Sequence, residues 1–128
     1  MGNIVTHKRI FVVDKTSETR QLHSEILRGA GYEVTIQGYV SGIPAQVRQM
    51  QPHLIILLYS PANEHQGWMT LQMLKMSKDL SVIPVIICIA PSERVRDMDG
   101  QLLRKGVTVL FEPFSADQLL GIVKATIG

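Results

Sequence analysis

The sequence of 128 residues has little of what several classes of protein require. It contains one cysteine, Cys88, which excludes an internal disulfide and fits a reducing cytoplasm. Its longest apolar runs, Leu54–Tyr59 and Val85–Ala90, are too short to cross a bilayer, and Met1 to Lys8 holds no apolar run typical of a signal peptide. We therefore expect a cytoplasmic protein that makes no contact with a membrane.

Net charge and aromatic residues are scarce as well. Lysine and arginine exceed aspartate and glutamate by 13 to 11, and the basic residues are scattered apart from the short cluster His7 to Arg9. Three tyrosines, three phenylalanines and one tryptophan offer no platform on which bases could stack. Direct nucleic-acid binding is therefore not expected. The length suits a single domain over residues 1–128, with a structured core at about residues 9–127.

Five apolar, strand-like runs alternate along the chain with five helical patterns. The strands are predicted near Ile10–Val13, Tyr32–Ile36, Leu54–Tyr59, Ile83–Ile89 and Val107–Phe111. Strict alternation with all-apolar central strands predicts an α/β fold, with a parallel sheet covered by helices on both faces. In such folds the functional site lies outside the carboxyl ends of the strands.

Local signals predict where several helices begin and end. The last helix has the clearest start, because Ser115 and Gln118 fit a capping box. An earlier start is predicted at Thr16 or Ser17. Gly100 lies inside the amphipathic pattern Glu93–Lys105, where a break in the helix is an open alternative.

Five segments of this sequence resemble receiver domains of response regulators, the phosphate-accepting domains of two-component signalling. The segments are Phe11–Asp14, Gly31–Val34, Gln51–Leu57, Ile83–Ile87 and Glu112–Phe114, and they follow one another in the family's order. The resemblance implies a flavodoxin-like, doubly wound (βα)5 fold whose five parallel strands have the order 2-1-3-4-5.

In that family an aspartate at the end of the third strand accepts a phosphoryl group, a nucleophilic role that a hydrocarbon cannot fill. A Mg²⁺ ion, held by this aspartate and an acidic pair after the first strand, offsets the charge of the transferred group. A hydroxyl after the fourth strand and a lysine after the fifth bind the phosphoryl oxygens.

Of these groups, this sequence retains the first acid alone. Asp14 matches that acid, whereas Lys15 occupies the position of the second. Leu58 falls on the phosphate acceptor, Ile89 on the hydroxyl and Glu112 on the lysine. The sequence thus predicts a degenerate receiver, or pseudo-receiver, that is not an enzyme, is not phosphorylated and binds neither Mg²⁺ nor another cofactor.

Two finer expectations concern the same pocket. Because Lys15 and Glu112 invert the family's charges at neighbouring positions, we hypothesise that they form an ion pair, which Asp14 could join. The alternative is that both long side chains reach solvent. The resemblance also implies a cis peptide bond between Glu112 and Pro113.

The leading functional hypothesis is a signalling module that binds another protein or forms a homodimer. The resemblance implies contacts through the family's fourth helix, fifth strand and fifth helix, which correspond here to Glu93–Lys105, Val107–Phe111 and Ser115–Ile127. An output domain beyond Gly128 is a further expected partner.

Two alternatives stay open: a phosphorylatable receiver under a different alignment, and a small-molecule sensor. The sensor's ligand pocket would lie at the strand ends and be lined by Leu58, Tyr59, Ile89 and Phe111.

Other conspicuous residues have simpler interpretations. Cys88 is predicted to be a buried, inert thiol. The four histidines lack the spacing of metal ligands and are predicted at the surface: His7, His23, His53 and His65. Three methionines of the third helix are predicted to belong mainly to the core, the alternative being a partner surface: Met69, Met73 and Met76.

Overall fold

Five parallel strands form one sheet in the order β2-β1-β3-β4-β5, which confirms the predicted flavodoxin-like topology. The structure is a computed structural model that describes residues 7–14, 17–39 and 42–128. The strands are β1 (Arg9–Val13), β2 (Glu33–Gln37), β3 (Leu54–Leu58), β4 (Val85–Ile89) and β5 (Val107–Phe111). All neighbouring pairs are parallel, so their carboxyl ends meet at one edge of the sheet.

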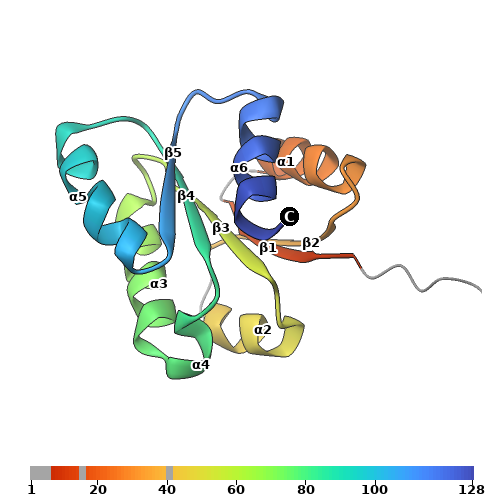
Figure 1. Cartoon of the computed structure of the whole chain (residues 1–128), viewed down its shortest axis with the longest axis horizontal. Helices are drawn as coiled ribbons and strands as arrows, with labels where there is room; N and C mark the ends of the chain where they lie inside the picture. The colour runs from red at the N-terminus through yellow and green to blue at the C-terminus, as the bar shows by residue number, and fades with distance from the viewer. Residues whose placement is uncertain (1–6, 15–16, 40–41) are drawn as a thin grey trace, which may run out of the picture.

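Helices cover both faces of this sheet (Figure 1). One face carries α1 (Ser17–Gly29) and α6 (Ala116–Ile127). The other carries α2 (Ile43–Met50), α3 (Glu64–Met76), α4 (Lys78–Ser81) and α5 (Glu93–Arg104). None of the helices in the described ranges is both long and apolar enough to span a membrane.

The two central strands, β3 and β4, are buried along their whole length. Their side chains alternate between two cores, as the two-residue period of a strand requires. Leu54, Ile56 and Leu58 pack with the α1–α6 side, whereas Ile55 and Leu57 pack with the α2–α5 side. Continuous apolar runs were therefore the correct sequence signal for these strands.

The capping box predicted for the last helix is present. The Ser115 hydroxyl accepts a hydrogen bond from the Gln118 backbone N–H at 3.1 Å, and the Gln118 side chain accepts one from the Ser115 N–H at 2.7 Å. Such a cap is worth about 1 kcal/mol of helix stability. The first helix, α1, begins at Ser17, one of the two residues predicted for its start. The other, Thr16, lies outside the described residues.

Helix α5 runs through Gly100 without the break that remained open from the sequence. Val95 and Leu102, on either side of this glycine, are both buried, so both halves of the helix are anchored to the core. The helix ends before Gly106, whose φ of 76° is a left-handed conformation that favours glycine.

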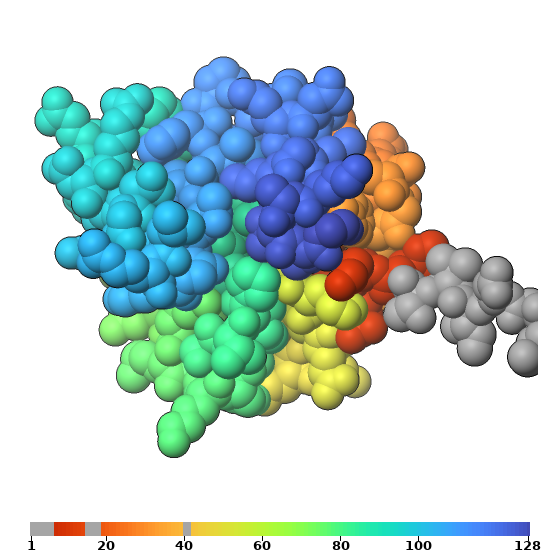
Figure 2. Space-filling model, viewed as in Figure 1, coloured from red at the N-terminus to blue at the C-terminus, as the bar shows by residue number. Residues whose placement is uncertain are grey.

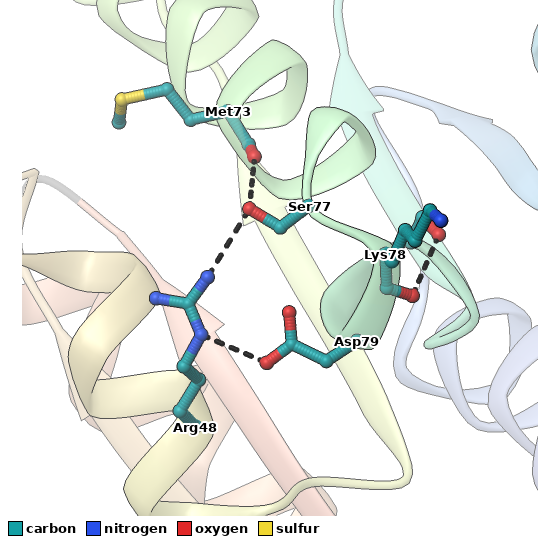
Figure 3. Close-up of polar contacts among 6 residues, drawn as sticks. Arg48, Met73, Ser77, Lys78 and Asp79 are labelled. Carbon is teal, nitrogen blue, oxygen red and sulfur yellow. Dashed lines mark hydrogen bonds and ion pairs between the residues drawn. The ribbon is translucent and has the colours of Figure 1, made fainter.

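Helix α4 is a single turn that the sequence pattern did not predict. One turn holds one buried apolar residue, Leu80, and so produces no repeat. Arg48 links α2 to α4 and to Ser77, the residue before α4 (Figure 3). Its Nε donates to Asp79 at 2.8 Å, and its Nη2 donates to the Ser77 hydroxyl at 3.2 Å. The Ser77 hydroxyl in turn donates to the carbonyl of Met73.

The prediction that three methionines of α3 belong to the core is wrong. Leu71 and Leu74 take the inner face of the helix and are buried. The methionines fall on the outer face, so between 46% and 75% of each one's surface is exposed: Met69, Met73 and Met76. The pattern could not distinguish the two faces, because apolar residues occur all round this helix.

Candidate functional site

The residues predicted at the strand ends are brought to one edge of the sheet. Asp14 follows β1, Leu58 and Ile89 end β3 and β4, and Glu112 follows β5. The backbone continues the sheet pattern at this edge, since the Glu112 N–H donates to the Ile89 carbonyl at 2.9 Å. The parallel topology therefore places these four positions along one edge of the sheet.

Leu58 and Ile89 are part of the protein core. Leu58 is 6% exposed and packs with the α1–α6 side, where Val12 and Cys88 are its neighbours in the same cluster. Ile89 is 4% exposed and belongs to the core on the opposite face. The two positions at which the receiver pattern places a carboxylate and a hydroxyl are thus filled with hydrocarbon.

Asp14 is buried and has His23 of α1 as its partner. The His23 Nδ1 lies 3.2 Å from the Asp14 Oδ2, and the side chains are 11% and 8% exposed. A carboxylate can only accept hydrogen bonds, so His23 is the donor. The contact becomes an ion pair whenever the imidazole is protonated.

The surface position predicted for His23 is therefore wrong. His23 precedes the buried Leu27 by one helical turn, so the two share a face of α1, and this spacing was the signal available in the sequence. His7 and His65 are exposed, as predicted. His53 is part-buried, and its Nδ1 accepts a hydrogen bond from the Arg9 N–H at 2.9 Å.

The segment after β5 closes over the imidazole. The Glu112–Pro113 peptide bond is cis, in agreement with the resemblance. Phe114, the next residue, stacks on His23 with ring centroids 5.6 Å apart and ring planes 27° apart. His23 is thereby held between an aromatic ring and the Asp14 carboxylate.

Glu112 lies at the rim of this pocket and is part-exposed. Burial raises the pKa of its carboxyl, and the nearby negative charge of Asp14 raises it further, whereas His23 lowers it. The hypothesised ion pair between Lys15 and Glu112 cannot be placed, because Lys15 lies outside the described residues.

Tyr39, from the segment after β2, lies at this edge of the sheet, a position that the sequence did not reveal. Its hydroxyl donates a hydrogen bond to the backbone carbonyl of Leu58 at 2.9 Å. Burial raises the pKa of Tyr39 far above its usual value, and the charge of Asp14 adds to this effect. A lone tyrosine in a loop has no periodic signature, so only the tertiary contact identifies it.

The described residues at this edge do not fit the Mg²⁺ ion of the receiver pattern. The Leu58 side chain offers no oxygen, its backbone carbonyl accepts a hydrogen bond from Tyr39, and the Oδ2 of Asp14 is engaged with His23. Magnesium demands near-octahedral oxygen ligation, and one carboxylate that is already hydrogen-bonded supplies too few ligands for it. In the described part of the chain, no cluster of three or more histidine, cysteine, aspartate or glutamate side chains could hold a metal.

The space beside Leu58 is also too small for a ligand. It is bordered by Val12, His23, Leu58, Cys88 and Phe114 and has no room for a water molecule. Cys88 is fully buried, and burial raises the pKa of its thiol, as expected of an inert core cysteine. This side of the strand ends is closed.

Comparison with known proteins gives structural matches alone. No protein-family model and no curated protein matches the sequence. Among solved structures, the chemotaxis response regulator CheY4 of Vibrio cholerae is similar, with a TM-score of 0.78 and 21% identity over 94% of this chain and 99% of that one. The receiver domain of a histidine kinase from Syntrophus aciditrophicus gives a TM-score of 0.71 and 26% identity over 94% and 89%.

A third match is NtrX from Brucella abortus, with a TM-score of 0.75 and 22% identity over 95% of this chain and 28% of that longer one. This chain has the fold of response-regulator receiver domains. At the strand ends of this receiver-like chain, Leu58 and Ile89 are buried and His23 contacts Asp14.

Proposed function

We propose that this receiver-like chain is a cytoplasmic signalling module that works without phosphorylation, binds no Mg²⁺ and catalyses no reaction. The observation that carries the proposal is the buried hydrocarbon of Leu58 at the position of the phosphate acceptor. The pairing of Asp14 with His23 supports it, because an internal donor takes the place of a metal ion at the acid that remains.

Without a phosphoryl switch, such a module transmits a signal through contact with a partner. We place this contact on the surface formed by α5, β5 and α6, which is the surface predicted from the resemblance. β5 is an edge strand, and Leu103 on α5 is 62% exposed. The partner is a second copy of the chain, another protein or an output domain beyond Gly128. We do not assign direct binding to nucleic acid or a membrane.

The sensor alternative has less support. Of its four proposed lining residues, Leu58, Tyr59 and Ile89 are at most 6% exposed. They also divide between two cores, Leu58 on one face of the sheet and the other two on the opposite face. A shared ligand cavity would require both cores to open.

The decisive experiment is incubation with acetyl phosphate and Mg²⁺, followed by intact mass spectrometry. A receiver domain with an intact acceptor aspartate, treated in parallel, serves as the positive control. We expect the control to gain one phosphoryl group and this chain to gain none. A reproducible phosphoryl adduct on this chain would overturn the proposal.

The contact surface can be tested separately by light scattering over a range of protein concentrations. If the chain forms a homodimer through α5, β5 and α6, Leu103→Glu should weaken it. Leu22→Glu is the matched control, because Leu22 on α1 is 54% exposed and lies outside this surface. Equal weakening by both variants would argue against this location.

A further inference from the structure

A groove of about 740 Å³ lies between α5 on one side and α3 with α4 on the other. In Figure 2, α5 lies directly above the green surface of α3 and α4. Leu71 and Leu102 form a buried part of its lining, and Trp68 and Met98 are half-buried beside them. The groove therefore offers apolar surface that no element in the described part of the chain covers.

The charged residues that line the groove are all cationic: Lys75, Arg104 and Lys105. Arg104 and Lys105 are exposed, and neither has an ion-pair partner among the residues that the structure describes. The Lys75 ammonium donates to the carbonyls of Ser81 at 3.0 Å and Ile83 at 3.1 Å. An ammonium group has three donors, so one remains for a ligand.

The length of the groove suits about two turns of a helix. Its lining on α3 extends from Trp68 to Met76, which is a rise of roughly 12 Å at 1.5 Å per residue. An amphipathic helix binds such a groove through apolar side chains at positions i, i+3 or i+4, and i+7. The exposed Met76 provides an adaptable surface at one end.

We propose that this groove binds a short amphipathic helix with acidic flanks from another protein. Its apolar side chains would pack on Trp68 and Met98, and its carboxylates would meet the three cations that line the groove. A second copy of the chain is a poor occupant, because a symmetric dimer through the groove would bring the same cations together. The groove lies on the α3 side of α5.

The test begins with selection of 12-residue peptides from a random display library on the intact chain. We expect the enriched peptides to be acidic and to carry apolar residues at helical spacing. Binding of each synthetic peptide is then measured by fluorescence, because Trp68 is the single tryptophan and lines the groove. Affinity should fall as salt is raised, since exposed charges are screened.

Two charge-reversal variants locate the binding. Lys105→Glu should reduce the affinity for the selected peptides at least tenfold. Lys124→Glu is the matched control and should leave affinity within twofold, because Lys124 is an exposed lysine near the end of α6 rather than α5. Both lysines are cations near the C-terminus of a helix, so each charge reversal should change the stability of its helix by a similar amount.

Four outcomes would overturn the proposal. The enriched peptides could be basic or uncharged, or Lys105→Glu and Lys124→Glu could weaken binding equally. Inorganic tripolyphosphate could bind with the same sensitivity to Lys105→Glu while no peptide does, which would indicate a small-anion site. Light scattering could instead reveal a dimer that Met98→Glu disrupts, which would assign the groove to a second copy. The acetyl phosphate experiment is unaffected by any of these results.

Discussion

The pocket at the strand ends and the groove between α3 and α5 differ in how their apolar surface is covered and how their charged groups are paired. In the pocket, Leu58 is buried hydrocarbon and His23 is the hydrogen-bond partner of the buried Asp14, and no water fits beside them. In the groove, apolar surface remains uncovered and two exposed cations have no ion-pair partner among the described residues. Charge inside a fold requires an internal partner, whereas charge at the surface is solvated at little cost.

The largest expected effect comes from placing a carboxylate at position 58. Leu58→Ala should cost about 2–5 kcal/mol of unfolding free energy, because it leaves a cavity in the core. Leu58→Asp should cost more, since it also buries a second negative charge near Asp14. Urea denaturation measures both. If Leu58→Asp were as stable as Leu58→Ala, the pocket would be more hydrated than a closed core.

The next effect concerns the pair of Asp14 and His23. His23→Leu should cost about 3–5 kcal/mol at neutral pH, because it leaves a buried carboxylate without its partner. The double variant Asp14→Leu/His23→Leu should recover most of this loss, because two apolar groups replace a polar pair. A double-mutant cycle measures the coupling. Purely additive losses would mean that the two side chains are independent.

A smaller effect is expected from Glu112→Gln. Burial raises the pKa of Glu112, so the folded state holds its proton more tightly than the unfolded state does. The resulting stability is complete below the unfolded pKa of about 4.3 and is lost as pH rises through the higher folded value. The variant should therefore match the original protein near pH 4 and become relatively more stable toward neutral pH.

Urea denaturation at several pH values measures this difference. The opposite trend, in which the original protein gains stability over Glu112→Gln as pH rises, would mean that the carboxylate has a cationic partner. Lys15 is the cation predicted for that role, so the experiment also tests the ion pair that the described residues cannot show.

The smallest effect on stability is expected in the groove. Lys105→Glu should change the unfolding free energy by no more than about 0.5 kcal/mol, because Lys105 is exposed. Thermal denaturation of Lys105→Glu and Leu58→Ala, measured in parallel, compares the loss of stability in the two regions. A loss comparable to that of Leu58→Ala would show that the groove is structural, and the difference between the two regions would disappear.

Much of this arrangement could be predicted from the sequence. The all-apolar runs of β3 and β4 and the capping box at Ser115 are local signals, and the structure confirms them. The positions of His23, Tyr39 and Met76 could not be predicted as reliably. The spacing of His23 from Leu27 indicates a shared face of α1, but local periodicity does not identify the distant elements that contact His23, Tyr39 or Met76.

From the sequence alone, the parallel α/β fold could be predicted, and Leu58 and Ile89 could be identified as hydrocarbon side chains at two strand ends. A leucine side chain cannot act as a nucleophile in any fold, so the residue type alone excludes Leu58 itself as a phosphoryl acceptor. The tertiary structure alone decided that His23 of α1 meets Asp14 after β1 and that cations from two helices line one groove. These contacts join residues from separate elements, and packing between those elements sets the distances.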